Sequence, residues 1–146
     1  MSVARILLDT NVLSELMRPR PEQQVLDWFA AQGAQTRFVI SAVTQAEILL
    51  GIALLPAGKK RTALANAAQT MFEQEFHGLN LAFDEHAAPL YASIVAQRSR
   101  SGAPISVEDA QIAAIASRHR VPLATRNIKD FAQVAGLELI DPWEPA

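Results

Sequence analysis

The chain of 146 residues contains no cysteine, which excludes disulfide bridges, zinc–thiolate sites and catalysis by a thiol nucleophile. Long apolar runs are also missing, and no segment is long enough to span a membrane. The first residues lack the basic, apolar and small-residue regions of a signal peptide. We therefore expect a cytoplasmic protein that does not contact a membrane.

Strong charge of one sign is absent as well. The net charge is −2, from 13 Lys and Arg against 15 Asp and Glu, so no global basic field attracts nucleic acid. The basic residues occur in small groups, for example Arg18 with Arg20, residues 59–61, and Arg126 with Lys129. Each group alone is best explained as a solvated helix end. Together they are compatible with a local surface for a polyanion.

Half of the residues are hydrophobic, and this length and composition predict one packed domain over residues 1–146. Short apolar or β-branched runs predict strands at 6–8, 37–41, 79–83, 120–124 and 137–140. Helical periodicity follows the first strand and recurs at 22–32, 42–55, 59–76, 85–100 and 107–118. This alternation predicts an α/β fold with three α/β/α layers and a central parallel sheet.

Three polar residues, Asp9, Thr10 and Asn11, stand where the first strand ends and a helix begins. Ligand sites in open parallel sheets gather outside the carboxyl ends of the strands, which would place Asp9 at such a site. All three residue types are also common helix N-caps. Because Thr10 or Asn11 can cap the helix, Asp9 is not needed for that purpose. The stretch alone leaves both roles of Asp9 open.

Two further acids stand at unusual places. Glu47 is the only acid of the helix 42–55, which is apolar almost all round and is therefore expected to be buried. An ionised carboxylate there is costly unless a buried Arg or a hydrogen-bond donor meets it, or unless its head reaches solvent. In the helix 107–118, Asp109 shares a face with Ile112, Ala113 and Ala116, whereas Glu108 shares one with Gln111, Ile115 and Arg118. We therefore expect Asp109 to point inwards and Glu108 to face solvent, with Ser106 capping the helix.

The topology would bring these acids to one edge of the sheet, together with Asn127, which follows the strand 120–124. Converging carboxylates repel one another, and neither Lys nor His is embedded among them. A hard divalent cation relieves this repulsion, so we expect Asp9, Glu47 and Asp109 to bind Mg²⁺, or Mn²⁺ in its place. Phosphodiester hydrolysis is the natural chemistry of such a centre. Thr10, Thr44 and Thr125 are candidate hydrogen-bond partners around the metal or the scissile phosphate.

The segments 8–15, 41–47, 104–113 and 124–131 resemble the PIN-domain endoribonucleases, and more narrowly the FitB-like branch of the VapC-type toxins. The resemblance runs over nearly the whole chain. It implies a Mg²⁺-dependent ribonuclease that cleaves RNA, forms a homodimer, and is inhibited by an antitoxin of the VapB or FitA type. DNA would be contacted only through that antitoxin.

Within this resemblance, Asp9, Glu47 and Asp109 match the three core acids of the family. The fourth catalytic position falls on Asn127, where many relatives have Asp, or on Asp130 three residues later. A second hypothesis is a catalytically inactive PIN-like module that binds a partner protein or nucleic acid, although the three intact acids argue against it. A phosphatase of small substrates is a weaker third.

Overall fold

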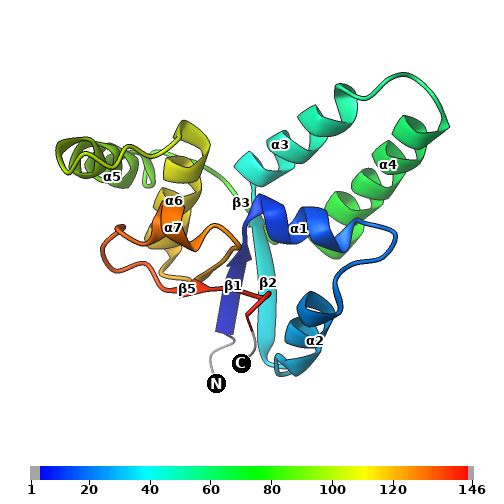
Figure 1. Ribbon diagram of the computed structural model, residues 1–146, viewed down its shortest axis with the longest axis horizontal. Coiled ribbons are helices and arrows are strands. Elements are labelled where there is room, and N and C mark those ends of the chain that lie inside the picture. Colours follow the sequence, from blue (N-terminus) through cyan, green and yellow to red (C-terminus); the bar gives the residue numbers. More distant parts are fainter. Residues whose placement is uncertain (1–3, 145–146) are drawn as a thin grey trace.

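The computed structural model describes residues 4–144, and its centre is one sheet of five strands (Figure 1). The strands are β1 (Ala4–Leu8), β2 (Thr36–Ser41), β3 (Asn80–Leu81), β4 (Leu123–Ala124) and β5 (Leu139–Ile140). Their order across the sheet is β3-β2-β1-β4-β5, so β1 is the central strand. All pairs are parallel, and every strand therefore ends at the same edge. The predicted parallel sheet is confirmed.

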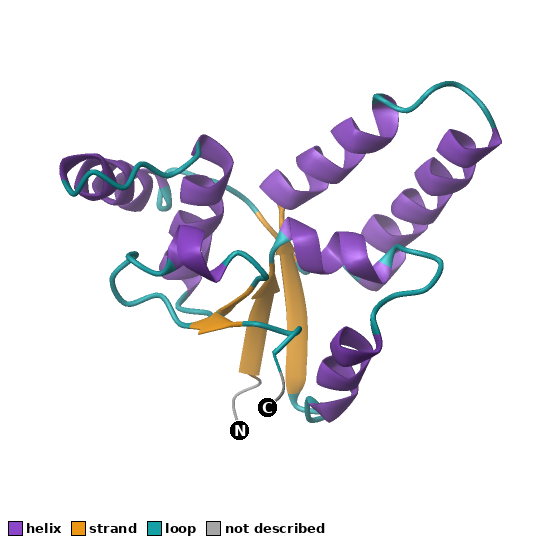
Figure 2. Ribbon diagram, in the orientation of Figure 1, coloured by secondary structure: helices purple, strands orange, loops and turns teal. Residues whose placement is uncertain are grey.

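Helices cover both faces of this sheet, as Figure 2 shows. One face packs against α1 (Thr10–Leu16), α2 (Gln23–Ala31), α3 (Ala42–Ala53), α4 (Lys59–Thr70) and the short π-helix η1 (Met71–Glu75). The other packs against α5 (Ala88–Arg100), α6 (Val107–His119) and α7 (Ile128–Phe131). Leu7 belongs to the second core while Ile6 and Leu8 belong to the first, because successive strand side chains alternate in direction. The three predicted layers are confirmed.

Several elements are shorter than the sequence predicted. The strands predicted over 79–83, 120–124 and 137–140 are reduced to the two residues each of β3, β4 and β5. The helix predicted over 85–100 begins at Ala88, since the Asp84 carboxylate accepts the N–H groups of His86 and Ala87 and holds a turn before it. The helix predicted over 59–76 is α-helical to Thr70 and then continues as η1.

The prediction that α3 is buried all round is wrong. Ile48 and Ile52 pack into the core, but Leu49, Leu50 and Leu54 are 44%, 59% and 75% exposed. In Figure 1, α3 and α4 project together beyond the sheet, and these three leucines are exposed in the part of the chain that the structure describes. Even so, no helix within residues 4–144 is long and apolar enough to cross a membrane.

Candidate active site

Asp9 lies at the carboxyl end of the central strand, where its backbone N–H donates to the carbonyl of Ala124 at 2.9 Å. Its side chain is only 3% exposed and accepts three hydrogen bonds. Oδ1 accepts from the backbone N–H of Thr10 at 2.8 Å, and Oδ2 accepts from the Thr125 hydroxyl at 2.6 Å and the Asn11 amide at 3.3 Å. Asp9 is itself the N-cap of α1, so the expectation that Thr10 or Asn11 caps this helix is wrong.

The buried position of Asp9 raises its pKa above the ordinary value, because burial disfavours the ionised form. The hydrogen bonds from Thr125 and Thr10 oppose this shift, since they stabilise the carboxylate, and the negative charge of Glu47 adds to it. Asp9 is therefore oriented by donors on two elements and at the same time destabilised by its surroundings.

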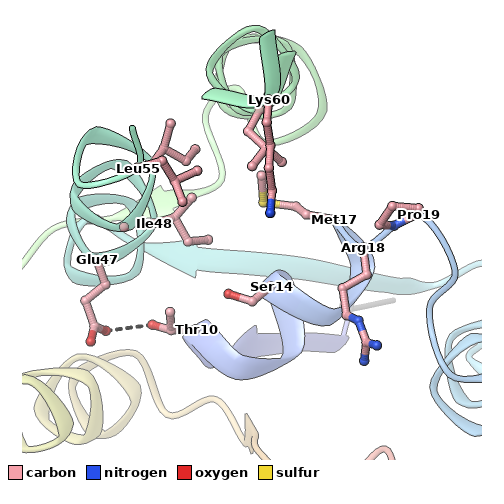
Figure 3. Close-up of a pocket in the computed structure, with 12 residues that line it drawn as sticks. Thr10, Ser14, Met17, Arg18, Pro19, Glu47, Ile48, Leu55 and Lys60 are labelled. Carbon is pink, nitrogen blue, oxygen red and sulfur yellow. Dashed lines mark hydrogen bonds between the residues drawn. The ribbon is translucent and has the colours of Figure 1, made fainter. Parts of the chain in front are cut away.

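Glu47 lies on α3 and is joined to α1 by threonine hydroxyls. The Thr10 hydroxyl donates to Oε1 of Glu47 at 2.7 Å, as the dashed line in Figure 3 marks, and the Thr44 hydroxyl lies 3.0 Å from that of Thr10. No basic side chain within residues 4–144 forms an ion pair with Glu47. The donor that meets this carboxylate is thus Thr10. Ser41 caps α3 by accepting the N–H of Thr44 at 3.1 Å, which fixes the start of the helix next to the sheet edge.

Asp109 lies in the first turn of α6, whose N-cap is Ser106 as predicted. Asp109 is half-buried while the adjacent Glu108 is exposed, so the predicted difference between these acids is confirmed. The assignment of Ile115 to the solvent face is wrong, because this residue is fully buried in the core that α6 fills.

Burial raises the pKa of Asp109 to about 6, and the negative charges of Asp9, Asp130 and Glu47 add to this shift. A hydrogen bond with Ser106 partly opposes it. The negative charges of Asp9, Glu47 and Asp130 thus all act on the carboxyl group of Asp109. The predicted convergence of Asp9, Glu47 and Asp109 is visible in their charges, because those of Asp9 and Glu47 both raise the pKa of Asp109.

The structure distinguishes the two candidates for the fourth position. Asn127 is exposed, precedes α7, and its side chain makes no hydrogen bond within the part of the chain described. Only its backbone N–H is used, donating to Oγ1 of Thr125 at 3.0 Å. The charge of Asp130, in contrast, contributes to the raised pKa of Asp109. Of the two, Asp130 is the one coupled to the acids.

Arg98 holds Asp130 in place, and sequence reasoning did not identify it as a site residue. Arg98 is 6% exposed, and its guanidinium donates to the carbonyls of Ala103 at 2.6 Å and Asp130 at 2.7 Å. The signal was present, because Arg98 continues the helical spacing of Tyr91 and Val95 and thus lies on the buried side of α5. A cation on an apolar helix face indicates a partner that the local sequence does not show.

The donor set at this edge suits a hard cation. Within residues 4–144, no three acidic or histidine side chains are spaced as ligands of one ion. Mg²⁺ in proteins, however, uses one or two carboxylates and keeps several waters. Asp9 and Asp109 offer carboxylate oxygens whose raised pKa values reflect burial and unrelieved repulsion. Because both side chains carry negative charge when ionised, these residues fit a divalent cation, whereas an anionic substrate without a metal would be repelled.

A groove begins at Thr10 and Glu47 and runs between α1, α3 and α4, as Figure 3 shows. Its volume is about 390 Å³. The walls are mostly apolar, with Ile48 and Leu55 on the side of α3 and Lys60 on α4. We call it the α1–α3–α4 groove. It leads from the acidic edge of the sheet along the projecting helices.

Comparison with known proteins gives consistent results. The PIN domain family profile matches residues 6–137. The VapC ribonuclease Y4jK of Sinorhizobium fredii is 43% identical over 141 residues, which are 97% of this chain and 99% of that protein. The toxin FitB of Neisseria gonorrhoeae is 38% identical over 138 residues, 94% and 98% of the two chains. The solved structure of FitAB bound to an IR36 DNA fragment superposes with a TM-score of 0.87 at 38% identity, covering 97% of each chain. This chain belongs to the PIN domain family, in the group that contains the VapC and FitB proteins.

Proposed function

We propose that this protein is a cytoplasmic, Mg²⁺-dependent endoribonuclease that acts as the toxin of a toxin–antitoxin pair. The observation that carries the proposal is the pair of carboxylates Asp9 and Asp109 at the carboxyl edge of the sheet, both with raised pKa values. The names of the similar proteins, a VapC ribonuclease and the toxin FitB, support the same activity.

Asp9 and Asp109 would hold the metal, with Glu47 as a further ligand or as the group that orients the attacking water. Bound there, Mg²⁺ or Mn²⁺ would supply Lewis-acid assistance to phosphodiester hydrolysis. Thr125 and Asn11 keep Asp9 oriented, and Thr10 keeps Glu47 directed to the same edge. Asp130, or Asn127 in its stead, would complete the site.

The α1–α3–α4 groove supports an antitoxin of the VapB or FitA type as the inhibitory partner. Its apolar walls suit an amphipathic segment, and Glu47 at its end suits an arginine, which forms charge-assisted pairs with carboxylates. The solved structure of FitAB bound to a DNA fragment supports DNA as a further partner of such a complex, and we propose that the antitoxin alone contacts it. An arginine in this position would compete with the metal for the same carboxylate oxygens.

The exposed outer side of α3 supports a homodimer. Leu50, together with Ala42 and Ala46, lines a hollow that α3 shares with Phe83 and the start of α6. Leu49, Leu54 and Val107 are also exposed large apolar residues. An apolar surface of this kind is typical of a protein interface.

A cleavage assay with labelled single-stranded RNA distinguishes the enzyme from an inactive binding module. The wild-type protein should cleave RNA with Mg²⁺ or Mn²⁺ and stop when EDTA is added. Asp9→Asn should lose the activity yet still bind RNA. Metal-independent cleavage, or equal activity of wild type and Asp9→Asn, would refute the proposed site.

A further inference from the structure

Arg126 follows the threonine that binds the buried carboxylate of the site. Thr125 donates to Asp9, and the backbone N–H of Arg126 donates to Oδ1 of Asn11 at 3.2 Å. The amide of the same Asn11 side chain donates to Asp9. The side chains of Thr125 and Asn11 that orient Asp9 therefore also help to position the backbone of Arg126 at the end of β4.

The guanidinium of Arg126 lies over the ring of Trp143, 4.9 Å from its centroid. Trp143 is 9% exposed, whereas Arg126 is exposed. The indole N–H has no hydrogen-bond partner among residues 4–144. A phenylalanine at this position would avoid an unpaired buried donor, but tryptophan attracts a cation more strongly. The ring face that orders Arg126 thus gives a physical reason for a tryptophan here.

A hollow of about 600 Å³ connects Arg126 with the fourth position of the site. It is lined by Arg126, Asn127, Ile128, Lys129, Asp130, Asp141 and Glu144. Although three of these residues are acids, none forms an ion pair with Arg126; the ion pairs within the described chain are Arg18–Glu15 and His86–Glu85. Asp141 instead accepts the backbone N–H of Trp143 at 2.9 Å. The charge of Arg126 also acts on Glu15, but the carboxylate of Glu15 accepts its hydrogen bonds from Arg18 and from the backbone N–H of Glu22. Within the described residues the guanidinium of Arg126 thus has no carboxylate partner, and its N–H groups can bind an anion from outside the chain.

We propose that Arg126, held on Trp143, binds a backbone phosphate of single-stranded RNA next to the cleavage site. This inference rests on the proposed ribonuclease function. The acidic edge repels a polyanion and the whole chain has a net charge of −2, so a neighbouring phosphate needs a local cation. A guanidinium binds phosphate oxygens with paired hydrogen bonds, and such a contact positions the strand without reading its bases.

The test measures binding of a labelled single-stranded RNA of mixed sequence in EDTA over a series of NaCl concentrations. Arg126→Gln should weaken binding about fivefold or more and reduce the slope of log K against log [salt] by about 0.7, the value for one phosphate contact. Arg126→Lys should keep the slope but lose affinity, because an ammonium lacks the planar group that stacks on Trp143 and forms two parallel hydrogen bonds to a phosphate. Arg37→Gln is the matched control, since it removes the same charge from an exposed position in β2, away from the carboxyl edge.

Equal effects of Arg126→Gln and Arg37→Gln, or no effect of Arg126→Gln, would overturn the inference. Binding of poly-glutamate is measured in the same way. If Arg126→Gln loses the binding of poly-glutamate that wild type shows but keeps wild-type RNA binding, the inference is also overturned, and Arg126 is assigned to an acidic protein partner. In the cleavage assay with Mg²⁺, Arg126→Gln should raise KM more than it lowers kcat. A wild-type KM in an active Arg126→Gln variant contradicts this inference alone, whereas RNA binding through Arg126 without any wild-type cleavage contradicts only the proposed function.

Discussion

The Thr10 hydroxyl donates a 2.7 Å hydrogen bond to Oε1 of Glu47, a residue 37 positions further along the chain. The backbone N–H of the same threonine binds Oδ1 of Asp9 at 2.8 Å. Thr10 therefore contacts two acids that come from different elements of the fold. These two hydrogen bonds connect the carboxylates of Asp9 and Glu47 through a single residue.

Replacing the Thr10 hydroxyl should impair the site without unfolding the protein. In Thr10→Val, Glu47 loses its donor and can adopt other rotamers, so we expect RNA cleavage to fall about tenfold, equivalent to about 1.4 kcal/mol. Thr10→Ser keeps the hydroxyl and should retain most of the activity. Thr70→Val, at an exposed position at the end of α4, is the control. Similar rates for the Val and Ser variants at position 10 would show that this bond does not matter.

The raised pKa of Asp109 predicts how stability depends on pH in the absence of metal. Because this pKa is about 6 in the folded protein against an ordinary 3.8, the folded state binds more protons between these pH values. The contribution of Asp109 to the free energy of unfolding should therefore fall as the pH rises from 4 to 6 and remain at the lower level above. Asp109→Asn should be more stable than wild type at pH 7 by about 1–2 kcal/mol, allowing for partial solvation. Urea denaturation of both proteins in EDTA at pH 4.5 and 7 measures this effect, and a stability difference between Asp109→Asn and wild type that does not grow over this range would contradict it.

Adjacent acids on α6 should differ in their effects on metal binding and cleavage. A ligand that binds only the folded state raises the melting temperature, so Mg²⁺ or Mn²⁺ should stabilise the wild-type protein. Asp109→Asn should weaken this shift and abolish RNA cleavage, because its half-buried carboxylate faces the other acids. Glu108→Gln should change neither, since Glu108 is exposed. If both substitutions reduced the metal shift equally, the assignment of Asp109 as the ligand would fail.

Periodicity and strand-end polarity were enough to predict the layers, the parallel sheet and the electrostatic coupling of Asp9, Glu47 and Asp109. What they could not predict depends on partners distant in sequence. Asp9 caps α1, and its orientation depends on Thr125, which is 116 positions away. The sequence of three adjacent polar residues therefore did not show which of them caps the helix. The burial of α3 was predicted wrongly because apolar residues on a helix can face either the core of their own chain or a surface that binds another chain. The sequence pattern is the same in both cases, and the leucines of α3 are exposed.

Arg98 should be a positioning residue for Asp130, and its removal should cost stability as well as alter the site. Its guanidinium is buried and donates to the carbonyls of Ala103 and Asp130, so Arg98→Met keeps the apolar stem but leaves both acceptors unpaired. We expect the free energy of unfolding to fall by about 2–4 kcal/mol. Arg100→Gln, an exposed arginine on the same helix, should change it by less than about 0.5 kcal/mol.

A second measurement separates positioning of Asp130 from simple loss of stability. The charge of Asp130 helps to raise the pKa of Asp109, so release of α7 should lower the pKa of Asp109 towards its ordinary value. Carboxyl-carbon NMR titration of Arg98→Met, at a temperature where it is folded, reports that pKa directly. Asp130→Asn should lower the pKa of Asp109 by the same mechanism without the large loss of stability, because the backbone carbonyl that Arg98 binds is retained. If Arg98→Met is destabilised but leaves the pKa of Asp109 unchanged, Arg98 supports the fold and does not position Asp130.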